Sequence, residues 1–361
     1  MLSRGLLPAA VLLTSVLLSG CAAPAASPAG PAAGPRPPLT DLRPPPDPRS
    51  FTGPATAALG QPDIVAPPAP VQHLPVTVTD HQGTRVTVTD TSRILAFDLA
   101  GTLAATVFGL GLGGRVVGRD VSTAFPSARN LPLVTHNGHQ LNAEAILALR
   151  PTVVLTDTTI GPWDAVLQLR DAHVPVVVLD PKRTIDTVGR LVREVADALG
   201  APAAGDQLAN RLNGEITAKK AEIAKLVPAD PARRLRIVFL YLRGQAGVYY
   251  LFGGGSGADS LIDALGGRDV ATEAGVEGMR PVNPEALVKA GPDVILVMTK
   301  GLQSVGGVGG ALRVPGVAQT PAGLHHRFVD MDDAQILSFG PHTADVLDAL
   351  ARTLYSPGAA G

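Results

Sequence analysis

The same pattern occurs twice in the chain, as Asn142-Ala-Glu-Ala-Ile-Leu-Ala-Leu-Arg-Pro-Thr-Val-Val-Leu155 and as Asn283-Pro-Glu-Ala-Leu-Val-Lys-Ala-Gly-Pro-Asp-Val-Ile-Leu296. Each copy has an asparagine able to cap a helix, a glutamate in the first turn, an apolar stripe, a proline and then a buried strand. The alternative is chance similarity between two amphipathic helix–strand units. A true repeat predicts two homologous α/β lobes with one cleft between them.

Around these units, short β-branched strands alternate with helical patterns, a rhythm that predicts parallel sheets flanked by helices. A predicted β-hairpin, Val76-Thr-Val-Thr and Val86-Thr-Val-Thr, precedes them. From Thr184 to Leu226 there is no strand signal, and helical spacing there predicts a helix long enough to cross between two lobes. The predicted fold class is therefore α/β, with two Rossmann-like lobes joined by a long helix and a ligand cleft between the lobes.

The N-terminus carries a targeting signal. Arg4 precedes an apolar run from Leu6 to Leu18, and Leu18-Ser-Gly-Cys21 follows at once. A run this short indicates a secretory signal peptide rather than a transmembrane helix, which needs about 20 apolar residues. Leu-Ser-Gly-Cys resembles the lipobox of bacterial lipoproteins, in which the cysteine is lipid-modified and becomes the mature N-terminus. An ordinary buried thiol is the alternative for Cys21.

Residues 22–70 carry 15 of the 33 prolines and almost no hydrophobic periodicity, which predicts an extended, semi-rigid tether. The predicted regions are a signal peptide (1–20), a lipid-anchored Pro/Ala-rich tether (21–73), an N-terminal α/β lobe (74–182), a connecting helical segment (183–230) and a C-terminal α/β lobe (231–356). The expected location is the extracytoplasmic face of a bacterial cell membrane, with the lipid as the anchor.

Composition excludes several classes of partner and site. The 361 residues have a formal net charge of -1 and are 17% charged, below the roughly 25% of a typical soluble domain. Without a basic excess, nucleic acid is not an expected partner. A single cysteine excludes an intramolecular disulfide, a CxxC redox pair and any cysteine-rich zinc or iron–sulfur site.

The lipobox, the opening hairpin, the repeated units and the connecting helix together resemble the helical-backbone class of periplasmic binding proteins. That class delivers metal chelates (cobalamin, ferric siderophores and haem) to ABC importers. The resemblance covers residues 74–356. It implies a non-enzymatic binding protein whose partners are its ligand, an ABC permease dimer with its ATPase, and the membrane that holds its lipid anchor.

Two local motifs narrow the resemblance to haem. They are Asn137-Gly-His139-Gln-Leu-Asn-Ala-Glu144, just before the first repeat helix, and Tyr241-Leu-Arg243-Gly244, which closes an apolar strand. Both are similar to haem-binding lipoproteins of the HmuT type, in which a histidine from one lobe and a tyrosine from the other ligate the iron. The resemblance thus implies haem as the transported ligand, held by His139 and Tyr241, in a pathway of iron acquisition.

The residues themselves agree with this assignment. In the strand Leu235–Leu242 successive side chains alternate faces, so Tyr241 and Arg243 point the same way about 7 Å apart, at the carboxyl end of the strand. Phenolate and imidazole both suit ferric haem, and a neighbouring guanidinium favours the charged phenolate. A core tyrosine with a satisfied hydroxyl is the alternative for Tyr241.

Other residues are weaker candidates. Tyr249 and Met298 lie in segments that also resemble the family and are expected at the haem, although core packing explains Met298 equally well. His136 is a rival to His139 as the iron ligand. The pair His325-His326 has no third ligand nearby and is expected in a solvated loop. The glycines of Gly253–Gly257 indicate a turn and helix start near a haem propionate.

Glu144 and Glu285 occupy the same early-helix position in the two repeat copies. In the resembling class, equivalent acidic residues pair with arginines of the two permease subunits, so both are expected to dock the importer. The alternative is that each carboxylate only complements its helix dipole, worth about 0.3–1 kcal/mol.

The sequence is also compatible with other functions. The same fold carrying a ferric siderophore or a corrinoid is one, with Arg243 and Tyr249 facing an anionic chelate. A lipid-anchored hydrolase and a purely structural envelope lipoprotein are others. Catalysis finds little support, because the chain has no GxSxG, HExxH or Walker motif.

Overall fold

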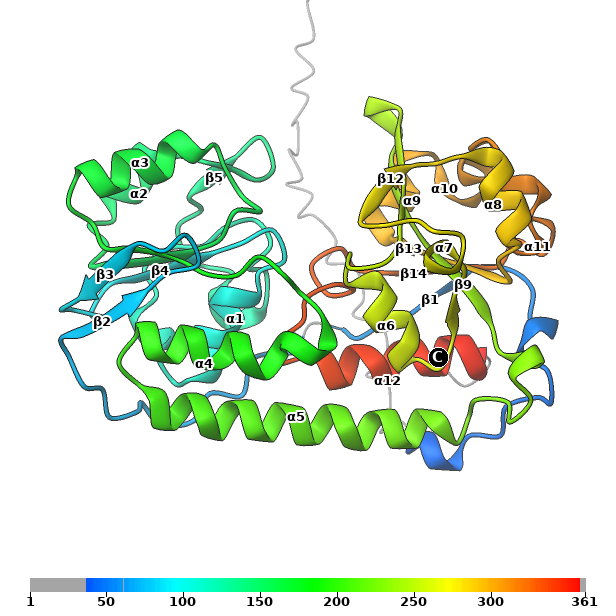
Figure 1. Cartoon of the computed structure of the whole chain (residues 1–361), viewed down its shortest axis with the longest axis horizontal. Helices are drawn as coiled ribbons and strands as arrows, with labels where there is room; N and C mark the ends of the chain where they lie inside the picture. The colour runs from blue at the N-terminus through cyan, green and yellow to red at the C-terminus, as the bar shows by residue number, and fades with distance from the viewer. Residues whose placement is uncertain (1–36, 61, 358–361) are drawn as a thin grey trace, which may run out of the picture. The chain divides into compact units, whose positions relative to one another are not determined.

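The computed structural model describes residues 37–60 and 62–357, so the predicted signal peptide and Cys21 lie outside the described residues. This part of the chain contains two α/β lobes and a helical connection between them (Figure 1). Within it, no helix is both long and apolar enough to cross a membrane.

The N-terminal lobe is built on a three-stranded parallel sheet of order β4-β7-β8. All four residues of β4 are buried, as expected for a parallel strand covered by helices on both faces. The predicted hairpin is confirmed as β2 and β3. The elements of this lobe are β2 (Val76–Thr79), β3 (Arg85–Val88), β4 (Ile94–Phe97), α1 (Thr102–Gly109), β5 (Thr135–His136), β6 (Gln140–Leu141), α2 (Ala143–Ala148), β7 (Val153–Thr156), α3 (Trp163–Asp171) and β8 (Val176–Val178).

Two helices connect the lobes, α4 (Val188–Ala198) and α5 (Pro202–Ala224). With 23 residues, α5 is about 34 Å long. It packs against α4 on the side of the N-terminal lobe and against α12 (Thr343–Tyr355) on the side of the C-terminal lobe (Figure 1). The predicted long connecting helix is therefore present.

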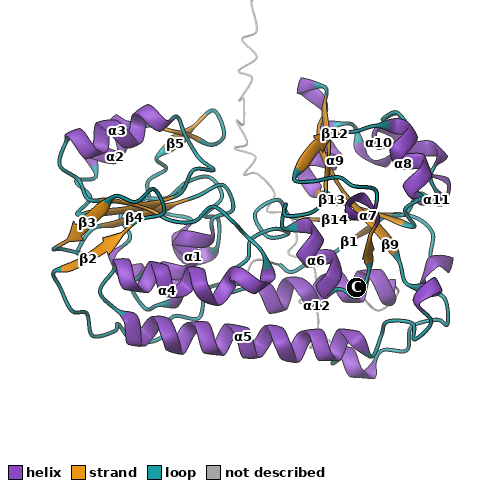
Figure 2. Ribbon diagram, viewed as in Figure 1, coloured by secondary structure: helices purple, strands orange, loops and turns teal. Residues whose placement is uncertain are grey.

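The C-terminal lobe surrounds a seven-stranded sheet of order β1-β14-β13-β9-β10-β12, with β11 also paired to β9 (Figure 2). Its strands are β1 (Ala55–Thr56), β9 (Arg236–Arg243), β10 (Val248–Phe252), β11 (Arg268–Asp269), β12 (Met279–Pro281), β13 (Val294–Met298) and β14 (Phe328–Met331). Its other helices are α6 (Ala258–Ala264), α7 (Val270–Glu273), α8 (Pro284–Ala290), α9 (Thr299–Ser304), α10 (Gly307–Ala311) and α11 (Pro321–Leu324). Short 3-10 turns complete the described chain: η1 (Leu39–Asp41), η2 (Pro48–Ser50), η3 (Gly113–Arg115), η4 (Pro126–Ala128), η5 (Ile185–Thr187), η6 (Pro231–Arg233), η7 (Gly244–Ala246) and η8 (Val317–Gln319).

This sheet is not parallel throughout, which the alternating rhythm of the sequence did not predict. Strands β1, β14, β13, β9 and β11 pair in parallel, whereas β10 pairs antiparallel with both β9 and β12. Only the short turn η7 separates β9 from β10. A parallel connection needs a crossover of a dozen or more residues, so this turn can only return the chain antiparallel.

The sequence repeat appears as two equivalent helix–strand units, α2–β7 and α8–β13. The side chain of Asn142 accepts a hydrogen bond from the Ala145 amide at 3.0 Å, and that of Asn283 accepts one from the Ala286 amide at 3.1 Å. Both helices are followed by a residue of positive φ just before the proline, Arg150 at 46° and Gly291 at 56°. The local chemistry of capping and chain reversal is thus the same in the two lobes.

The predicted tether of residues 21–73 is wrong from Pro37 onward. Residues 37–60 and 62–73, called here the N-terminal strap, bury four apolar side chains in the core, those of Leu39, Leu42, Ala57 and Ile64. The strap also contacts both lobes: β1 pairs with β14, and the Asp63 carboxylate accepts from the Ser127 amide at 3.0 Å. Average composition missed it because a few well-placed apolar residues suffice to hold a proline-rich segment on existing surface.

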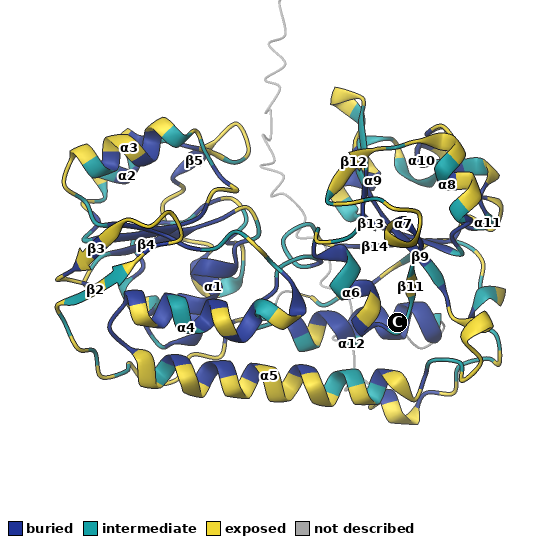
Figure 3. Cartoon of the chain, viewed as in Figure 1, coloured by how far each residue is buried: buried dark blue, intermediate teal, exposed yellow. Residues whose placement is uncertain are grey.

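The lobes share one hydrophobic cluster that runs along α4, α5 and α12. Figure 3 shows the buried stripe of α5 facing the lobes and its exposed stripe facing away. Two further clusters lie within single lobes, one in each. The shared core holds the carboxyl ends of the two central sheets near a common cleft.

Candidate functional site

A cavity of about 430 Å³ lies between the lobes and brings together residues from both. The N-terminal lobe contributes residues that follow β4 and those of the β5–β6 turn, and the C-terminal lobe contributes the carboxyl ends of β9 and β13. This is where open α/β sheets place their ligands. The lining residues are Leu99, Val121, Ser122, Gly138, His139, Tyr241, Leu242, Arg243, Gly244, Gln245, Ala246, Met298, Lys300, Gly301, Ser304, Asp333 and Ala334.

Tyr241 and Arg243 lie at the end of β9, on the same face of the strand as expected. The Arg243 Nε–H donates to the Tyr241 hydroxyl oxygen at 2.6 Å, and the guanidinium carbon lies 5.7 Å from the centroid of the Tyr241 ring. Behind it, the Tyr241 ring stacks on Phe252 of β10 with centroids 5.9 Å apart. The tyrosine oxygen is therefore held in the cleft beside a fixed positive charge.

His139 lies in the turn of the β5–β6 hairpin and lines the same cavity from the opposite lobe. Asn137 and Gly138 both take positive φ there, 45° and 89°, which closes the tight turn. Burial, together with the charges of Arg243 and Lys300, lowers the pKa of His139 below its usual 6.5. Within the described part of the chain, its buried Nδ1 atom has no hydrogen-bond partner. These surroundings thus favour the neutral form of the imidazole and leave its Nδ1 atom with unused bonding capacity.

The rival histidine is placed differently. His136 belongs to β5, where it pairs with Gln140, and its side chain is exposed. It is not among the residues that line the cavity. The hairpin turn therefore presents His139 to the cleft and leaves His136 at the surface.

Of the two weaker candidates, the structure places Met298 in the cavity but not Tyr249. Met298 ends β13 and lines the cleft. Tyr249 pairs with Leu242 and therefore lies on the sheet face opposite to Tyr241, whose cross-strand neighbour is Tyr250. It lines a separate groove with Pro281. The expected contact of Tyr249 with the ligand is thus wrong, because the antiparallel register turns its side chain away.

The glycine-rich loop after β10 is not part of the cavity either. Its amides of Gly255 and Gly257 donate to the Asp259 carboxylate at 2.8 and 2.9 Å. This carboxylate already occupies two of the amides that would cradle an anion. The predicted turn and helix start are confirmed, since Gly257 directly precedes α6. His325 and His326 are exposed, as expected, and the described residues contain no cluster of three or more His, Cys, Asp or Glu side chains able to hold a metal ion.

The fold also brings to the cavity lining residues that were not predicted from the sequence. Leu99 and Val121, respectively 49% and 38% exposed, provide apolar walls, and Lys300 and Asp333 provide charge. The available signal was positional, since Leu99, Lys300 and Asp333 all follow buried strands within two residues of their carboxyl ends. Burial raises the pKa of Asp333.

Glu144 and Glu285 are exposed in the first turns of α2 and α8. Each follows its capping asparagine by two residues, so the two carboxylates occupy equivalent places on the two lobes. Neither lines the cavity between the lobes. They are therefore available at the surface while a ligand occupies the cleft.

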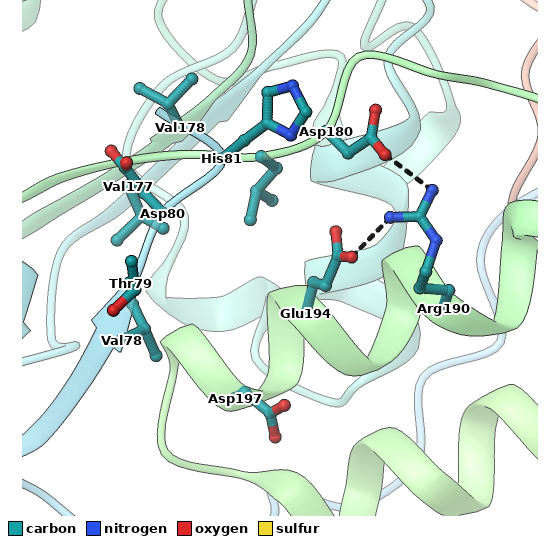
Figure 4. A pocket seen from close by; sticks show the side chains of 11 residues that line it. Val78, Thr79, Asp80, His81, Val177, Val178, Asp180, Arg190, Glu194 and Asp197 are labelled. Atoms are coloured by element: carbon teal, nitrogen blue, oxygen red, sulfur yellow. Dashed lines mark hydrogen bonds and ion pairs between the residues drawn. The ribbon is translucent and has the colours of Figure 1, made fainter. Parts of the chain in front are cut away.

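A second hollow, of about 220 Å³, lies on the N-terminal lobe between the β2–β3 hairpin, β8 and α4 (Figure 4). Arg190 bridges Asp180 and Glu194 there, with distances of 2.8 and 2.6 Å. Three of the charged side chains of this hollow are thus paired with one another. It contains none of the residues of the interlobe cavity, which remains the better candidate for a ligand site.

Comparison with solved structures relates this chain to proteins of known ligand. It is similar to the haem-binding protein HmuT, with 41% identity, a TM-score of 0.80, and coverage of 86% of this chain and 99% of that chain. Structures of the same protein with an arginine, a tyrosine or a histidine replaced by alanine match with TM-scores of 0.80, 0.81 and 0.81. The apo form of the periplasmic haem-binding protein RhuT from Roseiflexus sp. RS-1 matches with 37% identity and a TM-score of 0.66, covering 75% of this chain and all of that one.

Sequence comparison leads to the same group. The ABC transporter substrate-binding lipoprotein YvrC of Bacillus subtilis (strain 168) is 24% identical over 284 residues, which are 78% of this chain and 86% of that protein. The family model of periplasmic binding proteins matches residues 99–334, including both halves of the interlobe cavity. On these grounds, the chain belongs to the periplasmic binding protein family.

Proposed function

We propose that this protein is an extracytoplasmic lipoprotein that captures ferric haem between its lobes and delivers it to an ABC importer for iron acquisition. One contact carries the most weight: Arg243 donates to the Tyr241 oxygen within a cavity that His139 lines from the other lobe. The pairing of a phenol and an imidazole suits ferric haem iron. The protein acts as a binding protein and not as an enzyme.

Tyr241 and His139 are the proposed axial ligands, one from each lobe. Arg243 cannot ligate, because a guanidinium has no acceptor, but its Nε–H and positive charge stabilise a phenolate at Tyr241. The lowered pKa of His139 keeps its imidazole neutral and able to bind metal. Around the iron, Leu99, Val121 and Met298 offer apolar surface for the porphyrin faces.

The variants solved for HmuT support this choice of residues. The replaced residues are an arginine, a tyrosine and a histidine, and the tyrosine and arginine are two positions apart in that protein. His139, Tyr241 and Arg243 are the same three residue types, and the last two have the same spacing. Together with Lys300, these three residues are the aromatic and cationic residues that line the cavity.

Titration of the purified apo-protein with haemin tests the function. We expect a saturable Soret band with a ferric spectrum typical of tyrosine and histidine ligation. Parallel titrations with a ferric siderophore and with cobalamin serve as controls. If the protein binds one of these and develops no haem spectrum, its ligand is a siderophore or a corrinoid and the proposed function is wrong.

Glu144 and Glu285 are proposed to dock the protein on the two permease subunits. Both are exposed and equivalent in the two lobes. The double variant Glu144→Ala with Glu285→Ala should keep haem binding and lose most haem uptake or transporter-stimulated ATPase activity. Full transport by that variant would leave only the interaction with the helix dipoles, worth about 0.3–1 kcal/mol each.

Cys21 is proposed to carry the lipid that holds the protein at the outer face of the cell membrane. The motif Leu18-Ser-Gly-Cys21 after an apolar run supports this assignment. Cys21→Ala should move the protein out of the membrane fraction or leave its signal uncleaved. A processed variant that stays tightly bound to membranes would contradict the lipid anchor.

A further inference from the structure

The interlobe cavity contains a positive charge that iron ligation does not use. Its charged lining residues are Arg243, Lys300 and Asp333. Arg243 is engaged with the Tyr241 oxygen, and the Asp333 Oδ1 atom accepts from the backbone amide of Lys300 at 2.8 Å. Within the described part of the chain, no carboxylate lies within ion-pair distance of the Lys300 ammonium.

Lys219, unlike Lys300, has ion-pair partners among the described residues. Lys219 of α5 lies 2.6 Å from Glu222 and 2.9 Å from Asp348, so its charge is paired within the protein. Lys300 is exposed to the cavity without such a partner. A lysine without an ion-pair partner in the wall of this cavity is suited to an anionic group of the ligand.

The backbone around Lys300 is fixed relative to Tyr241. In addition to the contact with Asp333, α9 is held at the end of β9 by the Gly244 amide, which donates to the Ser304 hydroxyl at 2.9 Å. A Cβ at position 244 would collide with the Ser304 carbonyl, so glycine permits this close approach. The start of α9 and the end of β9 therefore form one wall of the cavity.

The charges of a bound haem match this arrangement. Ferric porphyrin carries one net positive charge at the iron, which a phenolate from Tyr241 neutralises, and Arg243 stands beside that phenolate. The two propionate carboxylates of haem remain to be balanced. A charged Asp333 would repel them, but burial raises the pKa of this carboxyl group and so lessens its tendency to carry charge.

We propose that Lys300 binds a propionate carboxylate of the haem and thereby selects tetrapyrroles with free carboxylates over those with amide side chains. This inference rests on the proposed function, because it names the part of the ligand that Lys300 recognises. A flexible ammonium adds a point charge and does not constrain the ring, so it contributes to affinity and selection and leaves the iron ligation unchanged.

The test uses two probes and three variants of the full-length protein. Haemin has free propionates, whereas haemin dimethyl ester keeps the iron and macrocycle and lacks them. The variants are Lys300→Ala, Lys300→Arg and the control Lys289→Ala, an exposed lysine of α8 outside the cavity. Equilibrium titrations at low and high ionic strength give the Kd for each pair.

We expect Lys300→Ala to raise the Kd for haemin about threefold to fivefold, a range typical of an exposed ion pair. Its Kd for the dimethyl ester and its Soret spectrum should equal those of the unaltered protein. Lys300→Arg should restore haemin affinity, Lys289→Ala should change nothing, and high salt should reduce the effect of Lys300→Ala.

Equal weakening of both probes by Lys300→Ala, or no weakening of haemin, would overturn the proposal. These outcomes differ from failure of the proposed function, which would appear as absence of a haem spectrum in the unaltered protein with either probe. Normal haemin binding by the unaltered protein with no effect at Lys300 therefore rejects the propionate contact alone.

Discussion

The two lobes present their proposed iron ligands in very different ways. Tyr241 lies on an eight-residue strand inside a seven-stranded sheet, stacked on Phe252 and bonded to Arg243. His139 lies in the turn between two strands of two residues each, and its Nδ1 atom has no partner within the described part of the chain. The two lobes thus share a similar scaffold, but only the C-terminal lobe holds its proposed iron-ligating side chain with several contacts. We expect Tyr241 to dominate haem affinity and His139 to complete the coordination.

The largest effect is expected at Tyr241. Tyr241→Phe removes the phenolate and keeps the ring that stacks on Phe252. The Kd for haemin should rise about 100-fold, equivalent to ~2.7 kcal/mol, with a spectrum of histidine ligation alone. Tyr250→Phe is the matched control, because Tyr250 is the cross-strand neighbour on the same face and does not line the cavity. A similar loss in both variants would contradict the dominance of Tyr241.

A smaller effect is expected at His139. His139→Ala should raise the Kd about 30-fold and change the ferric spin state, since one axial ligand is lost. His136→Ala serves as the control from the same hairpin and should retain a normal spectrum. If His136→Ala instead alters the ligand field, the role passes to that residue.

The surroundings of His139 should make the stability of the apo-protein depend on pH. Because the pKa of His139 lies below 6.5, the apo-protein holds the imidazole neutral at pH values where a free histidine is protonated. The unfolded chain then binds more protons than the native one, so this contribution to stability is present above pH 6.5 and is lost as the pH falls further. In His139→Ala, the unfolding free energy of the apo-protein should fall less steeply as the pH drops below 6.5. Denaturant titrations at several pH values measure this. The same dependence on pH in both proteins would contradict a buried, neutral imidazole.

Arg243 should have a moderate effect on affinity and a clear one on acid sensitivity. Arg243→Ala removes the donor to the Tyr241 oxygen and should raise the Kd about tenfold at neutral pH. Tyrosine ligation should then be lost at a higher pH during acid titration, because less positive charge stabilises the phenolate. An acid transition at the same pH in both proteins would show that the contact does not support ligation.

The smallest expected effects compare the repeat units themselves. Asn142→Ala and Asn283→Ala each remove one cap, and each should cost about 1 kcal/mol of unfolding free energy. Denaturant titrations of the two variants should give nearly equal losses. A much larger loss in one variant would contradict this equivalence and show that the two caps stabilise their lobes unequally.

Much of the site was predictable because its chemistry is local. Alternation along β9 placed Tyr241 and Arg243 on one face, and the direct contact between them agrees with it. In the sequence, only the Asn-Gly-His motif distinguished His139 from His136. In the structure, His139 lines the cavity and His136 lies at the surface. Lys300 and Asp333 were not found, because residues after separate strands converge only once the strand order is known.

The sequence by itself determined the two repeat units, the connecting helix and the tyrosine–arginine pair, since capping, periodicity and strand alternation act over a few neighbouring residues. Only the tertiary structure decided that the proline-rich segment from Pro37 is a strap on both lobes and that Tyr249 faces away from the cavity. Both depend on long-range contacts: the strap needs apolar gaps made by other elements, and the face of Tyr249 is set by the register of β10 on β9. Such contacts leave no periodic trace in the chain, so composition and spacing alone could not reveal them.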